Sequence, residues 1–403
     1  MSKHVQTLTL ILHLQLFGAT LFAQDESLSS VVKSGEDSGI DPFLNYDLSL
    51  WGNTSGGITR GVRFNSLLEF GATADTEKLG WWDGGQIYAS FLWNEGNLTD
   101  IPLTGLEGAF GLDHNQASDT FRVYSVYYQQ NFDSDRYTFK IGQLLADDDF
   151  MASNYAGLFV NSAFGVLPTI GNLSGFPEFP VAAPGVFASA QVSQEVGLQT
   201  GFYTNDAGPD EGSNWGFDWR LGGTAGYAWF SEANYAPTLG GLPASLTAGF
   251  FMQIDGVATD QGTGDTVNDE ELYSVYFMWD QSLAQDDKGN DEVGAFVLVG
   301  YNLDDERYLV NPFYMDAGVN WFGPIAGREN DVLGAAFNVG TYGSDYRAAN
   351  PTTEDSQWIL ELTYSAQLSD NAILQPDIQY IIDPEGASAD DALAVGFILS
   401  VSL

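Results

Sequence analysis

Hydrophobic and polar residues alternate along most of the chain. In the C-terminal segment, Leu393, Val395, Phe397, Leu399 and Val401 share one face, and mostly small or polar residues separate them. A period of two is typical of a β-strand with one apolar face. Comparable runs predict about sixteen strands, at 43–51, 60–71, 85–93, 121–130, 137–145, 186–193, 196–204, 215–235, 244–253, 271–280, 293–301, 314–323, 331–340, 358–366, 372–382 and 393–403.

The connections between these segments tend to alternate in length. Short connections are predicted near 131–136, 236–243, 323–330 and 367–371. Longer connections, many of them acidic, are predicted near 94–119, 254–270, 302–312, 341–356 and 383–392. An even number of hairpin-linked strands places both chain ends on one side. We therefore expect the short turns on the side of the chain ends and the long loops on the other side.

The alternation fits a closed barrel better than a soluble β-sandwich or solenoid. A sandwich also alternates, but it buries its apolar face against a second sheet. In lipid the sheet must close so that every backbone group is paired, with apolar residues outside and polar residues inside. The predicted fold class is all-β, a transmembrane antiparallel β-barrel of about 16 strands. Belts at the membrane interfaces are expected from aromatic residues near strand ends, namely Trp93, Trp229, Trp279 and Trp358.

One connection is far longer than a hairpin turn. Residues 146–185 follow the fifth predicted strand. They contain six large aromatic residues, namely Phe150, Tyr155, Phe159, Phe164, Phe176 and Phe179. Exposing so many aromatic side chains to water would be unfavourable. The segment is therefore predicted to fold into the barrel and narrow the pore, and the alternative is an outer cap packed on neighbouring loops.

The N-terminal residues predict export. Residues 1–23 have a positive charge near their start at Lys3, continue with an apolar run and end in a small residue, as a signal peptide does. A membrane-anchoring helix is the alternative, although the run is short for a membrane span. Residues 24–42 are interpreted as a short periplasmic lead-in, and 43–403 as the barrel in the outer membrane of a Gram-negative bacterium.

Charge and composition exclude several classes of protein. The chain has a formal net charge of −41 and no cysteine. Without residues 1–23 it keeps 12 basic and 54 acidic residues, so we expect no nucleic-acid partner. His114 is the only histidine after the signal peptide. A Ser-His triad or a histidine-rich zinc site is therefore not expected.

Several short motifs stand out along the chain, namely KIGQ (140–143), DDDF (147–150), FVNSAFG (159–165), FPEFPVAAPG (176–185), GREND (327–331) and LQPDIQYIIDPEG (374–386). Together they resemble the motifs of the OprB-type carbohydrate-selective porins. The resemblance covers most of the chain and implies a sixteen-stranded outer-membrane barrel for passive, sugar-preferring diffusion. The partners it implies are sugars or other small polar solutes, outer-membrane lipid and the barrel insertion machinery, with the protein a monomer or a homotrimer.

Two features depart from this family. The chain ends in Leu403, where outer-membrane barrels often end in an aromatic residue. The best-known sugar channels of the family line their constriction with arginine, and this chain has few basic residues. Their anion preference is therefore not expected here, and the acidic majority predicts weak cation selectivity in dilute salt.

Strand parity predicts which residues line the pore. The inward strand positions are Asp47, Arg63, Asn65, Glu69, Lys140, Gln199, Asp218, Arg220, Asp316, Asn320, Glu361, Gln375 and Asp377. The long segment adds Asp147, Asp148, Asp149, Phe150, Asn154 and Tyr155. Polar groups can exchange hydrogen bonds with sugar hydroxyls. The same residues could instead be the wet wall of any porin, in which arginine–carboxylate pairs stiffen the sheet.

No cofactor is expected, with one alternative. Carboxylate clusters can ligate Ca²⁺ through oxygen, so Asp147, Asp148 and Asp149 are a candidate structural calcium site. Three adjacent side chains converge on one ion only with difficulty, and the spacing is not that of an EF-hand. No catalytic residues are assigned. The alternatives to a porin are a secreted β-rich carbohydrate-binding protein without a pore, and an outer-membrane barrel enzyme.

Overall fold

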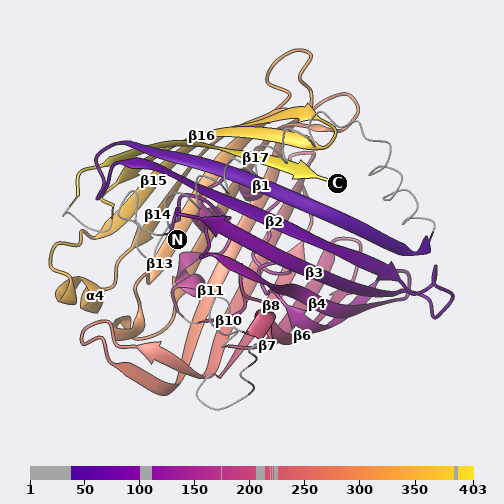
Figure 1. Ribbon diagram of the computed structural model, residues 1–403, viewed down its shortest axis with the longest axis horizontal. Coiled ribbons are helices and arrows are strands. Elements are labelled where there is room, and N and C mark those ends of the chain that lie inside the picture. The colour runs from indigo at the N-terminus through magenta and orange to yellow at the C-terminus, as the bar shows by residue number, and fades with distance from the viewer. Residues whose placement is uncertain are drawn as a thin grey trace.

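The computed structural model describes residues 38–99, 111–173, 175–205, 214–217, 219, 221, 226–384 and 389–403. The predicted signal peptide at 1–23 lies outside these residues, as does most of the predicted lead-in. The described chain forms one antiparallel sheet (Figure 1). Its strands are β1 (Ile40–Ser55), β2 (Gly61–Asp75), β3 (Gly85–Gly96), β4 (Thr120–Phe132), β5 (Tyr137–Leu144), β6 (Ala183–Gln191), β7 (Val196–Thr204), β8 (Tyr227–Tyr235), β9 (Thr238–Leu239), β10 (Leu242–Thr259), β11 (Thr266–Gln285), β12 (Asp291–Asn302), β13 (Phe313–Phe322), β14 (Val332–Thr341), β15 (Ser356–Ser369), β16 (Ala372–Ile382) and β17 (Ala392–Ser402).

Short helical turns occupy some of the connections. They are η1 (Ala156–Leu158), η2 (Ser162–Phe164), α3 (Pro168–Gly171), η3 (Asn214–Gly216), η5 (Glu306–Tyr308) and α4 (Ser344–Ala349). None of the helices in the described residues combines the length and apolar character needed to cross a membrane.

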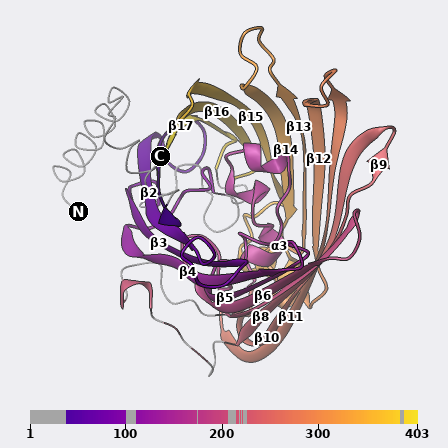
Figure 2. The same cartoon turned by 90° about the vertical axis from the view of Figure 1, so that its right-hand side faces the viewer.

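The sheet closes on itself. Strand β1 pairs with both β2 and β17, so that Asp47 lies opposite Leu67 on one side and Ser400 on the other. The two-residue strand β9 only pairs with the start of β10, and β8 pairs directly with β10. Among the described residues, sixteen longer strands therefore form the wall, which confirms the predicted closed barrel. Figure 2 shows the ring of strands around the short helices η1, η2 and α3.

The side chains of the strands alternate between the inner and the outer face, as predicted. On β17, Ala394 and Ile398 point inward and are buried, whereas Val395 points outward and is 40% exposed. Successive side chains of a strand point to opposite faces, so one register of β17 fixes both surfaces. The outer surface carries exposed aromatic residues, among them Trp93, Trp229 and Trp358.

The connections differ from the prediction in two places. The expected loop 254–270 is mostly strand, because β10 continues to Thr259 and β11 begins at Thr266. The expected strand 215–235 begins only at Tyr227, since Gly226 has a positive φ of 69° that ends the extended run. The aromatic residues before it lie outside the strand, and Trp219 donates a hydrogen bond to Gln143 on β5 at 2.8 Å.

Candidate functional site

Residues 145–182, here called the inner segment, connect β5 to β6, and all but Ser174 are described. Phenylalanines of this segment pack on inward-facing rings of the wall. Phe150 lies 5.1 Å from Phe230 of β8 between ring centroids. Phe159 lies 5.4 Å from Phe296 of β12. The segment thus lies against the inner face of the barrel, as Figure 2 also shows.

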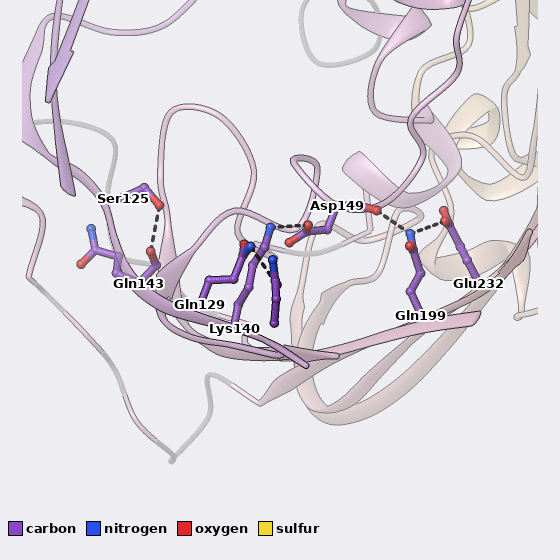
Figure 3. A network of polar contacts seen from close by, with 8 residues as sticks. Ser125, Gln129, Lys140, Gln143, Asp149, Gln199 and Glu232 are labelled. Atoms are coloured by element: carbon purple, nitrogen blue, oxygen red, sulfur yellow. Dashed lines mark hydrogen bonds and ion pairs between the residues drawn. The ribbon is translucent and has the colours of Figure 1, made fainter. Parts of the chain in front are cut away.

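Polar side chains of the wall hold the start of the inner segment. Lys140 of β5 donates a hydrogen bond to the Asp149 carboxylate at 2.6 Å. Gln199 of β7 donates to the Asp149 carbonyl at 2.5 Å and to Glu232 of β8 at 2.6 Å. Glu232 in turn accepts a hydrogen bond from the backbone N–H of Met151 at 2.8 Å. Figure 3 shows Lys140 and Gln199 reaching from the wall to Asp149.

The next residues are held by β11, β12 and β13. The Asp280 carboxylate accepts hydrogen bonds from the Ser153 hydroxyl at 2.6 Å and from the Asn154 amide at 2.9 Å. The Tyr155 hydroxyl donates to Asp291 at 2.6 Å. Asn320 donates from its side chain to the Tyr155 carbonyl at 2.8 Å.

Strands β15 and β16 hold the tip of the segment. The Glu361 carboxylate accepts hydrogen bonds from the backbone amides of Val160 at 2.6 Å and Asn161 at 3.1 Å. Gln375 donates to the Leu158 carbonyl at 2.7 Å. The Asn161 side chain donates to Gln379 at 3.1 Å. The inner segment therefore follows the wall from β5 to β16, with at least one polar contact at most of the strands between them.

Glycines on the wall provide the space for this path. A Cβ atom at Gly294 of β12 would lie 2.3 Å from the Tyr155 ring, and one at Gly334 of β14 would lie 2.7 Å from Leu158. Such distances are far below van der Waals contact. The absence of a side chain at these two inward positions lets the segment approach the sheet.

The inner segment changes the role of many predicted pore residues. Five inward strand residues are at most 3% exposed, namely Asn65, Asp316, Asn320, Glu361 and Asp377. Within the segment, Phe150 and Tyr155 are also buried. These seven side chains bind or pack on protein groups instead of lining open water. This differs from the expectation, which came from strand parity for the five strand residues and from the long segment for Phe150 and Tyr155. Parity indicates the inner face of the sheet, but it does not indicate what covers that face.

The other predicted residues remain accessible, wholly or in part. They are Asp47, Arg63, Glu69, Lys140, Asp147, Asp148, Asp149, Asn154, Gln199 and Gln375. Asp218 and Arg220 lie outside the described residues. Sequence reasoning missed Glu232, Asp280 and Gln379, although their strand parity marks all three as inward.

The β3–β4 loop adds a second set of contacts. Asp113 accepts a hydrogen bond from the Trp51 indole at 3.2 Å. Asn65 donates to the carbonyl of Asn115 at 2.7 Å, and the Asn115 side chain donates to Asp47 at 3.3 Å. This loop therefore covers part of the inner face of β1 and β2. Apart from the isolated His114, no feature of the sequence indicated that this loop covers the inner face.

Three adjacent carboxylates of the inner segment diverge. Asp147 accepts a hydrogen bond from the Phe179 amide at 3.2 Å, Asp149 pairs with Lys140, and Asp148 is exposed to the lumen. Burial raises the pKa of Asp147 to about 6. Partial loss of water around its carboxylate inside the barrel, and then the charges of Asp147 and Asp149, raise the pKa of Asp148 to about 7. In the described part of the chain, no group of three or more acidic or histidine side chains is arranged to hold a metal ion.

A closed antiparallel barrel with an apolar outer surface and a polar interior, narrowed by a segment bound to its own wall, defines an outer-membrane porin. The chain belongs to the carbohydrate-selective porin, OprB family, whose sequence profile matches residues 59–403. The family and the fold are those of a channel in the outer membrane of a Gram-negative bacterium.

Relatives and solved structures agree with this assignment. The chain is 24% identical to the porin QuiX of Acinetobacter baylyi, over 83% of this chain and 82% of the relative. It is 22% identical to Porin B of Pseudomonas aeruginosa, over 89% and 87%. The high-pH structure of Pseudomonas putida OprB matches with a TM-score of 0.78 and 19% identity, over 93% and 97%. OmpT of Vibrio cholerae, in a loop-deletion form, matches with a TM-score of 0.51 and 12% identity, over 90% and 99%.

Proposed function

We propose that the protein lets sugars and other small polar solutes diffuse passively between the inner segment and the inner wall of β1–β5. The observation that carries this proposal is the attachment of the inner segment along β5–β16. The inner segment occupies that side of the lumen and leaves partly accessible polar side chains on β1, β2 and β4, such as Asp47, Glu69 and Gln129.

The chemistry of this wall suits polyhydroxylated solutes. Sugar hydroxyls both donate and accept hydrogen bonds, so they pair with carboxylates, amides and phenols alike. The Tyr88 hydroxyl already donates to Glu69 at 2.9 Å, and Gln129 donates to Asn131 at 3.2 Å. A wall of partly satisfied polar groups binds each solute weakly, which is what fast passive diffusion requires.

Liposome swelling tests the proposal. Vesicles containing the folded barrel should swell in glucose and in sucrose faster than protein-free vesicles. A variant that lacks Phe150–Pro177 should show a higher single-channel conductance, because the inner segment no longer occupies the lumen. A folded barrel that admits no sugar would refute the proposal, and unchanged conductance in the folded variant would place the constriction elsewhere.

The route to the membrane is part of the same proposal. Residues 1–23 direct export, and the strand β17 (Ala392–Ser402) is the segment that the insertion machinery binds. N-terminal sequencing of protein purified from outer membranes tests the first point. Replacing Leu403 with Phe, the more usual terminal residue, tests the second by the rate of barrel assembly.

A further inference from the structure

A cavity of about 410 Å³ lies between the β3–β4 loop and the inner segment. The residues that line it and carry polar groups include Asp113, His114, Asp147, Ser162, Asn172 and Glu178. Its volume falls within the roughly 300–1,000 Å³ of small-molecule sites. The cavity is therefore large enough for one small solute, and its chemistry indicates which kind.

Two carboxylates in this cavity are not neutralised by the described residues. The Oδ2 atom of Asp147 accepts a hydrogen bond from the Phe179 amide, but its Oδ1 atom is buried and accepts none from another described residue. Glu178 has no hydrogen bond or ion pair of its side chain in the described ranges. Burial, and then the charge of Asp147, raises the pKa of Glu178 well above its ordinary value. A carboxylate pair of this kind is stabilised either by a proton or by a cation.

The nearby charged groups are already committed. Asp113 accepts hydrogen bonds from the Trp51 indole and from the Asn115 amide, so both of its oxygens are occupied. Lys140 is bound to Asp149 at 2.6 Å, and its ammonium also lies 5.5 Å from the centre of the Tyr127 ring. Asp113 is itself acidic and cannot neutralise the pair, and the Lys140 ammonium is already bound to Asp149.

We propose that the cavity binds a hydroxylated solute that carries one ammonium group, an amino sugar, with the ammonium between Asp147 and Glu178. This inference rests on the proposed sugar channel and names the solute class of one site in it. An ammonium donates three hydrogen bonds and so satisfies both carboxylates at once. Ser162, His114 and the side-chain oxygen of Asn172, whose amide nitrogen donates to Asn311 at 2.8 Å, line the cavity where the solute hydroxyls would lie. A bare metal ion is disfavoured, because the described residues hold no suitable group of three ligands.

Calorimetry on the full-length folded protein in detergent tests the proposal. Glucosamine should bind about tenfold more tightly than N-acetylglucosamine or glucose, because only glucosamine offers a charge-assisted hydrogen bond. Binding of glucosamine should also release a proton. Comparing the binding heats in buffers of different ionisation enthalpy detects this release. The E178Q and D147N variants should bind all three sugars alike. The matched control is D287N, which removes an equally negative but exposed residue of the β11–β12 turn.

Each other outcome contradicts the inference. Equal affinity for the three sugars in the unchanged protein would show that the cavity does not select an amino group, even if liposomes still swell in glucose and the porin function stands. The same loss in D287N as in E178Q would indicate general charge attraction. Displacement of glucosamine by micromolar MgCl₂ would indicate a metal site. Heat-modifiable mobility in gels shows that each variant is folded.

Discussion

The carboxylate of Glu361 on β15 accepts the backbone amide of Val160 at 2.6 Å, although 201 residues separate the two in sequence. The same carboxylate accepts the next amide, that of Asn161, at 3.1 Å. One buried side chain of the wall thus fixes the tip of the inner segment. The position of the inner segment in the barrel therefore depends on contacts of this kind as well as on the strand pattern.

Removal of that carboxylate should loosen the tip. In E361A, two buried backbone amides lose their hydrogen-bond acceptor, which should lower the free energy of unfolding by roughly 3 kcal/mol. Single-channel recordings should show larger current fluctuations, because the segment moves within the passage. E361Q keeps one acceptor oxygen and should be intermediate. The exposed E354A in the β14–β15 loop should behave as the unchanged protein, and quiet channels in E361A would contradict the role of this contact.

A side chain at Gly294 should displace the inner segment. Its Cβ atom would lie 2.3 Å from the Tyr155 ring, so G294A should destabilise the barrel by about 1–3 kcal/mol. The matched control is G157A, since a Cβ atom there meets nothing within 4 Å. Denaturant unfolding followed by gel mobility measures both. Equal stability of the two variants would show that the segment does not rest on β12 as described.

Ion selectivity should depend on pH. As the pH falls from 8 to 5, Asp148 protonates near pH 7 and Asp147 near pH 6, because both have a raised pKa. The lumen loses negative charge, so the cation preference in dilute KCl should fall over this range. The double variant D147N/D148N should start with the lower preference and change little. Reversal potentials measure the effect, and an unchanged potential across the range would mean that other acids set the field.

Salt should remove the same preference. The Debye length is about 8 Å at physiological ionic strength and shorter above it, so charges across a wet passage are screened. Cation selectivity should therefore be weak in dilute KCl and fade as KCl rises, while uncharged sugars pass at both concentrations. A clear anion preference in dilute salt would mean that basic residues such as Arg63 and Lys140 dominate the field.

The topology can be tested by labelling, because the chain has no cysteine. One single-cysteine variant replaces Glu354 in the β14–β15 loop, and a second replaces Asp287 in the β11–β12 turn. Both positions are exposed. A membrane-impermeant maleimide should label the first on intact cells and the second only after lysis. Labelling in the reverse order would place the long loops on the periplasmic side.

Strand positions and the two faces of the wall could be read from the sequence. The alternation around Phe397 predicted an outward apolar face, and the exposure of Val395 between the buried inward residues Ala394 and Ile398 confirms it. A period of two has a direct geometric cause, since successive side chains of a strand point to opposite faces. The length and aromatic content of the segment after β5 also indicated that it does not extend into water.

The contacts inside the barrel were decided only by the tertiary structure. Parity alone could not distinguish Asp47, which stays partly exposed, from Glu361 and Asn320, which the inner segment buries. Their partners lie more than 150 positions away along the chain, and no local pattern encodes which carboxylate will meet which amide. The sequence thus determined the barrel and its polar interior, because alternation is local. The path of the inner segment was set by long-range hydrogen bonds, because their partners lie on strands far away along the chain.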